Sequence, residues 1–326
     1  MKRVLPKLAA AQTSAPPGGL RKYLKEPSVL IKTSPCSITQ NDLVRLFTHE
    51  ITALQIKNFY PKEDAKRLGK ELGEKARNGE VDNWRVVTSD RGLERSDVWT
   101  MGDYIPYNVA VATNQLDAYF DGVERDLRKR RRKRQSNEGE REEGGAYLWP
   151  LDQFRLELDE IWSQGATLAR DKETGRLMGG GLPRIMLGPT RWKKGFVHAD
   201  QFSPLSTEKG LFSANIYLQL PSRELDVHGA DEGELHVWPL DIRTDWEWYS
   251  NQEILKGMTV QDAELQVKLR KALGGAPLKV KVCPGDLVLL CVQRPHAAVG
   301  FKDGTRVSLQ CFIQYHGYDE RLLIDI

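Results

Sequence analysis

Residues 286–315 read DLVLLCVQRPHAAVGFKDGTRVSLQCFIQY. Three short apolar runs follow one another in this stretch, at residues 286–292, 297–301 and 306–315, and Gly, Pro or Asp stands between them. Runs of this length, rich in β-branched and aromatic residues and closed by turn formers, predict β-strands. We therefore expect the C-terminal part of the chain to be built from short strands.

The same pattern of short apolar runs begins at Leu182. Further apolar runs broken by Gly, Pro and Asp occur at residues 184–187, 196–198, 213–220, 234–238 and 278–282. Short strands at regular spacing predict a sandwich or a closed jelly roll. A charged, helix-prone insertion interrupts them at residues 246–273. Residues 182–326 are thus predicted to form a jelly-roll core.

The N-terminal part has a different pattern. Residues 13–19 read TSAPPGG, which resists helix and strand, so residues 1–36 are expected to be a disordered arm. Residues 51–60 resemble a strand, whereas residues 64–76 and 116–127 have helical spacing. The prediction for the whole chain is an α+β fold: a double-stranded β-helix (jelly roll) with an N-terminal helical layer over residues 37–181.

Composition excludes several classes of protein. The 48 Lys and Arg against 45 Asp and Glu leave a net charge of +3, too small to indicate a nucleic-acid partner for the whole chain. No stretch approaches the roughly 20 apolar residues that cross a bilayer, so no membrane partner is expected. The cysteines lack metal-site or disulfide-scaffold spacing, which favours a reducing, cytoplasmic location; they are Cys36, Cys283, Cys291 and Cys311. The acid-poor N-terminus leaves a targeting sequence open, and no pattern indicates the oligomeric state.

Two charge blocks of opposite sign lie near residues 125–145. Residues 128–134 are all Lys or Arg, and residues 138–143 are mostly Glu. A nucleic-acid or nuclear-localisation patch is one interpretation. We favour a solvated helix end and a disordered insertion that its acidic neighbour partly neutralises.

A histidine and an aspartate stand two residues apart in the run around 196–198. Strand alternation puts His198 and Asp200 on one face, where both can bind one metal ion. His296, on a strand about a hundred residues later, would supply a third ligand if the roll closes. Two imidazoles and one carboxylate on one face of an octahedron leave positions open, which suits ferrous iron with dioxygen. The His-x-Asp tripeptide alone is a weak signal.

Arg306 follows the last histidine by ten residues. Its planar guanidinium can take the remote carboxylate of a dicarboxylic co-substrate in a two-bond fork, with Ser308 on the same strand face.

Together these motifs resemble the iron(II)- and 2-oxoglutarate-dependent oxygenases, in the broad branch with prolyl-hydroxylase-like enzymes and fungal enzymes that oxidise amino acids. The resemblance implies that His198, Asp200 and His296 bind iron, and that Arg306, assisted by Ser308, binds the C5 carboxylate of 2-oxoglutarate. It also implies that Asn215 or Tyr217 contacts the co-substrate, and that dioxygen is consumed. Two features depart from the family pattern: Gly233-Glu234 in place of the commoner Gly-Gly, and the insertion at 246–273.

The resemblance implies oxidation of an unactivated C–H bond by hydroxylation, desaturation or ring closure, with release of succinate and CO2. The intact Asp200 argues against halogenation, because related halogenases have Gly or Ala at that ligand. We expect a small polar metabolite, most simply a free amino acid of secondary metabolism. Candidate substrate-binding residues are Arg184, Arg191, Trp238, Phe312 and Tyr315.

Two other functions remain open from the sequence. One is an oxygenase acting on a prolyl residue or a nucleobase of a macromolecule, which the basic block at 128–134 would support. The other is a non-catalytic, cupin-like binding barrel, which would form no succinate.

Overall fold

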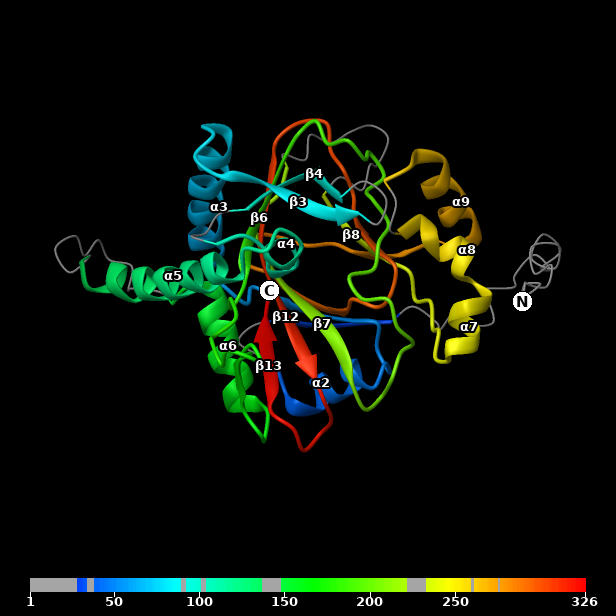
Figure 1. The fold of residues 1–326 in the computed structure, drawn as a ribbon, viewed down its shortest axis with the longest axis horizontal. Helices are drawn as coiled ribbons and strands as arrows, with labels where there is room; N and C mark the ends of the chain where they lie inside the picture. The colour runs from blue at the N-terminus through cyan, green and yellow to red at the C-terminus, as the bar shows by residue number, and fades with distance from the viewer. Residues whose placement is uncertain are drawn as a thin grey trace.

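The computed structural model describes residues 28–33, 38–88, 92–100, 104–136, 148–221, 233–258, 261–274 and 276–326. These residues form a mixed α+β fold around one large, mostly antiparallel sheet (Figure 1). No helix among them is long and apolar enough to cross a membrane. The cysteines that the structure describes, Cys283, Cys291 and Cys311, are free thiols, and Cys36 lies outside the described residues.

The large sheet has ten strands. Eight of them follow the order β1 (Val29–Thr33), β2 (Ala53–Lys57), β10 (Leu287–Cys291), β7 (Gly210–Gln219), β12 (Thr305–Tyr315), β6 (Leu182–Leu187), β4 (Gly92–Thr100) and β3 (Asp82–Thr88). Strand β13 (Leu322–Asp325) pairs with β12 and also with β5 (Ala166–Leu168). The β1–β2 and β13–β5 pairs are parallel and the others are antiparallel.

A small antiparallel sheet has the order β11 (His296–Ala298), β8 (Leu235–Val237) and β9 (Leu278–Val280). An isolated bridge joins His198 to His296 and so ties the segment before β7 to the edge of this sheet. His296 therefore lies where the small sheet meets the segment that carries His198.

The helices lie around the sheets. They are α2 (Gln40–Phe47), α3 (Lys62–Arg77), α4 (Tyr107–Ala112), α5 (Leu116–Ser136), α6 (Pro150–Ile161), α7 (Asp245–Ser250), α8 (Gln252–Leu255), the 3-10 helix η3 (Lys256–Met258) and α9 (Ala263–Leu273). Helices α3, α5 and α6 lie on one side of the molecule, and α7, α8 and α9 lie on the other (Figure 1). The insertion predicted at residues 246–273 corresponds to α7–α9.

The main core lies between the large sheet and helices α2, α3 and α6. Each of these helices contributes buried apolar residues, such as Phe47, Leu72 and Phe154, to one cluster with the sheet. Helix α2 begins at a capping box, in which the Thr39 side chain accepts from the backbone N–H of Asp42 and Asp42 accepts from that of Thr39. Such a cap stabilises a short helix, which can then present its apolar side to the sheet.

Strand alternation divides β12 between two environments. Val307, Leu309 and Ile313 belong to the main core, whereas Arg306 and Ser308 line a cavity on the opposite face. Because neighbouring residues of a strand point to opposite faces, one strand can both complete the core and carry the polar wall of a site.

The N-terminal part contains more strands than the predicted disordered arm and helical layer. Residues 29–33, placed in the disordered arm, form β1 and pair with β2, while residues 1–27 and 34–37 lie outside the described residues. A hairpin of β3 and β4 was not predicted, because charged residues interrupt apolar alternation at 82–100. Together with β2 and β5, strands β3 and β4 make residues 37–181 a mixture of helices and strands. The basic block at 128–134 lies in α5, and residues 137–147 lie outside the described residues.

Candidate metal centre

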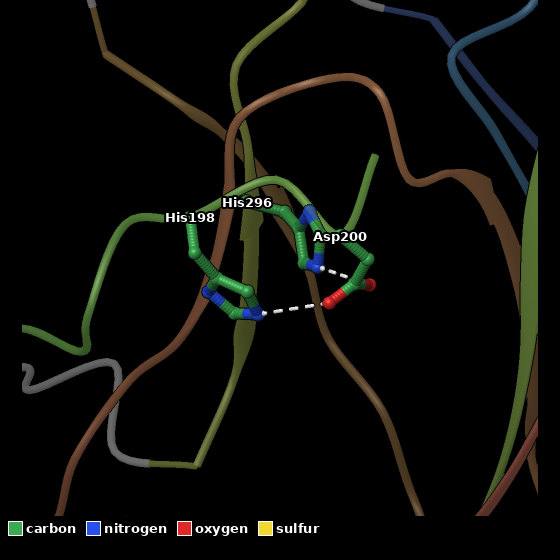
Figure 2. Close-up of side chains that lie close together, drawn as sticks. All are labelled: His198, Asp200 and His296. Atoms are coloured by element: carbon green, nitrogen blue, oxygen red, sulfur yellow. Dashed lines mark ion pairs between the residues drawn. The ribbon is translucent and has the colours of Figure 1, made fainter. Parts of the chain in front are cut away.

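Three potential metal ligands meet in the structure: His198, Asp200 and His296 (Figure 2). Their ligand atoms all lie within 4.8 Å of one another. The Nε2 atom of His198 is 3.6 Å from Oδ1 of Asp200, and Nε2 of His296 is 3.5 Å from Oδ2 of the same carboxylate. The two imidazoles thus point at one carboxylate, as ligands of a shared ion would.

Backbone pairing positions these side chains. The backbone N–H of His198 donates to the carbonyl of His296 at 3.0 Å, and the N–H of His296 donates to the carbonyl of His198 at 2.9 Å. The N–H of Asp200 donates to the carbonyl of Val292 at 3.0 Å. The segment that carries two of the ligands is therefore held directly against the one that carries the third.

A glycine permits this close approach. Gly195 has φ of +79°, and a Cβ there would lie 2.2 Å from the carbonyl oxygen of Ala298. A side chain at this position would push the segment that carries His198 away from β11.

Helix α9 also holds the segment in place. The buried Gln266 side chain accepts from the N–H of Val197 at 2.9 Å and donates to its carbonyl at 2.9 Å. It donates to the carbonyl of Gly257 at 2.7 Å as well. The insertion at residues 246–273 therefore supports Val197, the residue next to His198.

Hydrogen bonds orient both imidazoles. Nδ1 of His198 is 2.9 Å from the carbonyl oxygen of Phe196, and Nδ1 of His296 is 2.9 Å from that of Arg294. A carbonyl can only accept, so each Nδ1 carries the proton and, in a neutral ring, Nε2 keeps its lone pair. Such contacts are the usual support for metal-binding histidines.

The charge states suit cation binding. Burial, together with the neighbouring His296, lowers the pKa of His198 to about 4, so this imidazole is neutral at pH 7. Burial raises the pKa of Asp200, but contact with the His296 imidazole and the positive charge of Arg184 outweigh that effect. The net pKa of Asp200 is well below its usual range, so the carboxylate is charged.

A cavity of about 650 Å³ adjoins the three residues. The large sheet forms its polar wall, which includes Asn215, Tyr217, Arg306 and Ser308. Ser308 is the register partner of Tyr217 on one side and of Arg184 on the other. Residues that are far apart in the sequence thus form one row across β7, β12 and β6.

Arg306 is a buried cation without a carboxylate partner in the part of the chain that the structure describes. Its side chain donates to the Tyr217 hydroxyl at 3.4 Å and approaches Sδ of Met186 at 3.5 Å. Its guanidinium carbon lies 5.2 Å from the centre of the Tyr217 ring. Its buried Nε has no hydrogen-bond partner among the described atoms. A guanidinium in this state favours a bound anion.

Two of the five predicted substrate residues line this cavity. Arg184 and Phe312 do so, and Arg184 donates to Oε1 of Gln310 at 2.5 Å. Arg184 lies on β6 and Phe312 lies on β12. On both strands, positions that face the cavity alternate with positions that face the core.

The other three predicted substrate residues lie elsewhere. Arg191 is exposed and donates to Gln261 at 2.8 Å. Trp238 is buried in a separate core cluster against α9, because α9 packs on that side of the small sheet. Tyr315 is buried in the main core, where its ring lies 4.8 Å from that of Phe47. Tyr315 is an odd number of residues from Arg306, so strand alternation sends it to the opposite face.

Sequence reasoning missed several lining residues. Alternation along β12 would have found Gln310, which lies two residues beyond Ser308 on the same face. No sequence signal indicated Tyr107 and Asn108 of α4, or the aromatic Trp192, Phe196 and Phe202.

Asp325 also lines the cavity and gives a pH-dependent prediction. Burial raises its pKa to about 6, and its carboxylate accepts a hydrogen bond from Gln314. The pKa of Asp325 in the folded protein lies above the usual value of 3.8 for an aspartate, so the protonated, buried carboxyl contributes stability that is fully present below about pH 4 and is lost as pH rises through about 6. By this linkage, Asp325→Asn should stabilise the protein by up to about 3 kcal/mol at pH 8 and by little at pH 4.5.

Urea unfolding at both pH values measures this difference. The exposed Asp303 is a suitable control, and Asp303→Asn should show no such dependence. An equal effect of Asp325→Asn on stability at the two pH values would contradict the raised pKa of Asp325.

Comparison with known proteins gave no matching family model and no matching curated protein. Among solved structures, the chain is similar to an N-substituted L-amino acid dioxygenase from Burkholderia ambifaria AMMD, with a TM-score of 0.48, 12% identity, and coverage of 89% of this chain and 92% of that chain. A second structure of that dioxygenase is in complex with alpha-KG.

Two further structures are similar over most of their length. A Pseudomonas putida prolyl-4-hydroxylase has a TM-score of 0.38 and 15% identity, with coverage of 84% of this chain and 98% of that chain. The non-heme alpha-ketoglutarate-dependent carbocyclase SnoK from nogalamycin biosynthesis has a TM-score of 0.42 and 14% identity, with 90% of both chains covered.

Proposed function

We propose that this chain is an Fe(II)- and 2-oxoglutarate-dependent dioxygenase that oxidises an unactivated C–H bond of a small polar metabolite, most simply a free amino acid. One observation carries the proposal. Three ligand side chains converge on one point, and a buried arginine without a carboxylate partner among the described residues lines the same cavity. We infer further that the two sheets are the walls of a double-stranded β-helix.

The donor set fits ferrous iron. His198 and His296 offer imidazole nitrogens and Asp200 offers a carboxylate oxygen, all near one another and beside a cavity. A set of two histidines and one carboxylate leaves coordination positions for a bidentate acid and dioxygen. The carbonyls of Phe196 and Arg294 hold the two rings in the tautomer that binds a metal.

The polar wall fits 2-oxoglutarate. Arg306 would take the remote carboxylate, with the Ser308 hydroxyl as a second donor on the same strand face. Tyr217 already contacts Arg306 and would hold the guanidinium in place, while Asn215 offers an amide donor on the same strand as Tyr217. Bound iron would supply the oxygen chemistry, in which dioxygen and 2-oxoglutarate give succinate, CO2 and an oxidised substrate.

The rest of the cavity supports a small substrate with a carboxylate. Arg184 is close enough to Asp200 for their charges to interact, so an acid bound to Arg184 would lie near the metal ligands. The aromatic side chains of Phe196, Phe202 and Phe312 give the cavity an apolar wall. A cationic anchor and an aromatic wall select first for charge and then for shape.

A screen of amino acids tests the substrate class. With iron, ascorbate and 2-oxoglutarate present, at least one of the twenty amino acids should stimulate succinate release above the uncoupled background. Product masses should show a gain of oxygen or a loss of two hydrogens and no chlorine, because Asp200 occupies the ligand position that a halide would need.

Two results would contradict this proposal. Stimulation only by a prolyl peptide or an alkylated oligonucleotide would favour the macromolecular alternative. Absence of succinate under every condition, with iron bound, would favour a binding barrel without catalysis.

A further inference from the structure

A second cavity, of about 720 Å³, lies on the other side of β8 from the metal centre. Successive residues of β8 face the two cavities in turn: Leu235 lines the first, whereas His236 lines the second, and Trp238 just beyond the strand lines the second as well. The two cavities therefore share a wall and no lining residue.

The second cavity is strongly basic. Its cationic lining residues are Lys193, Lys194, Arg270, Lys279 and Lys302. No aspartate or glutamate is among the lining residues that the structure describes. By contrast, the first cavity contains both Asp200 and Asp325. Like charges around one hollow repel one another, so the arrangement favours a bound anion.

Contacts with the backbone hold the lysine-bearing segment in position. Arg270 of α9 donates to the carbonyls of Lys194 and Gly195 at 2.8 and 2.6 Å, and its guanidinium lies 5.2 Å from the Trp238 ring. A Cβ on Gly300 would lie 2.2 Å from the carbonyl oxygen of Trp192. The loops that carry Lys193 and Lys302 are thus packed closely together before any ligand arrives.

These features indicate the chemistry of the ligand. The Nη2 group of Arg270 donates to two backbone carbonyls, so the guanidinium does not present a fully free planar fork to a carboxylate. The remaining cations are lysines, which act as point charges and suit the tetrahedral oxygens of phosphate. Val299, Phe301 and two prolines line the same cavity and can cover an organic group.

We propose that this second cavity is a binding site for a small organic phosphate. The volume is in the range of about 300–1,000 Å³ that is usual for small-molecule sites, which favours a molecule such as a nucleoside diphosphate over a long polyanion. The proposal does not depend on the metal centre, and it can hold even if the proposed oxygenase activity fails.

Calorimetric titration of the metal-free, full-length protein with pyrophosphate and with ADP tests the proposal. Both should bind at about one equivalent, and added salt should weaken the binding. The double substitution Lys193→Glu and Lys194→Glu should weaken binding by at least about tenfold, because two lysine contacts to phosphate are replaced by repulsion. Both lysines are exposed, so the variant should fold normally, as thermal unfolding can check.

A control with the same change of charge separates the site from general attraction. Lys172 and Lys209 are exposed and lie outside the cavity, so Lys172→Glu with Lys209→Glu should leave binding nearly unchanged. Equal losses in the two double variants, or no binding of either phosphate, would overturn the proposal. Tighter binding of citrate than of pyrophosphate would overturn the phosphate assignment. Binding of a short DNA duplex without binding of ADP would identify a nucleic-acid surface instead.

Discussion

The double variant His198→Ala, His296→Ala should lose iron and activity together. Two of the three converging ligand side chains disappear, and Asp200 alone cannot hold a divalent ion against water. We expect no stoichiometric iron after reconstitution under anaerobic conditions, and succinate formation reduced by on the order of a thousandfold or more. Metal analysis and succinate assays on the same preparation measure both effects.

A matched control is available. His316 is exposed, and Nε2 of its ring lies 3.2 Å from the Gln314 side chain, so His316→Ala should keep full iron occupancy and turnover. Neither imidazole belongs to an apolar core cluster, so the double variant should fold normally. Circular dichroism can check this. Full iron occupancy in the double variant would show that the metal binds elsewhere.

Arg306→Ala should raise the KM for 2-oxoglutarate by about a hundredfold to a thousandfold, which corresponds to the loss of a buried charge pair of about 3–4 kcal/mol. The guanidinium lies in the cavity with an unpartnered Nε, and the variant would leave the co-substrate carboxylate in a buried site without its cation. Steady-state kinetics should show a much larger change in KM than in kcat at saturating 2-oxoglutarate. Arg306→Lys should give an intermediate value, because an ammonium keeps the charge but loses the two-bond fork.

Arg191 provides the control for this experiment. It is an exposed arginine that contacts Gln261 and Trp192, so Arg191→Ala should leave the KM for 2-oxoglutarate unchanged. An unchanged KM for 2-oxoglutarate in Arg306→Ala would show that Arg306 does not bind the co-substrate. Loss of iron binding without a change in this KM would indicate an indirect structural effect.

Much of the strand pattern could be predicted from local sequence. The apolar runs at 286–292 and 306–315 form β10 and β12, and the charged insertion at 246–273 forms α7–α9. These predictions succeed because turn residues and apolar runs act over a few neighbours. The hairpin of β3 and β4 escaped prediction, since its strands are charged and pair with each other and with β6 without an apolar alternation to reveal them.

Within the site, the structure brings some of the predicted residues together and places others elsewhere. The metal ligands were proposed from donor type and strand alternation, and the structure brings those three side chains together. The run at 196–198, which was predicted to be a strand, forms only the isolated bridge of His198 to His296, so backbone pairing rather than strand alternation positions His198. Tyr315 and Trp238 were predicted to line the substrate pocket, and both are packed in apolar cores. Alternation applied consistently along β12 would have excluded Tyr315 and included Gln310.

The sequence by itself determined where most of the C-terminal strands form, which residues on each of those strands share a face, and which side chains can bind a metal or an acid. These properties depend on residues that are near one another along the chain. Only the tertiary structure decided that His198 pairs with His296, that Gln266 of α9 holds the segment beside His198, and that lysines from three separate segments surround a second cavity. Contacts between distant segments depend on how the two sheets and the insertion pack together. That packing is a property of the whole chain and leaves no local pattern in the sequence.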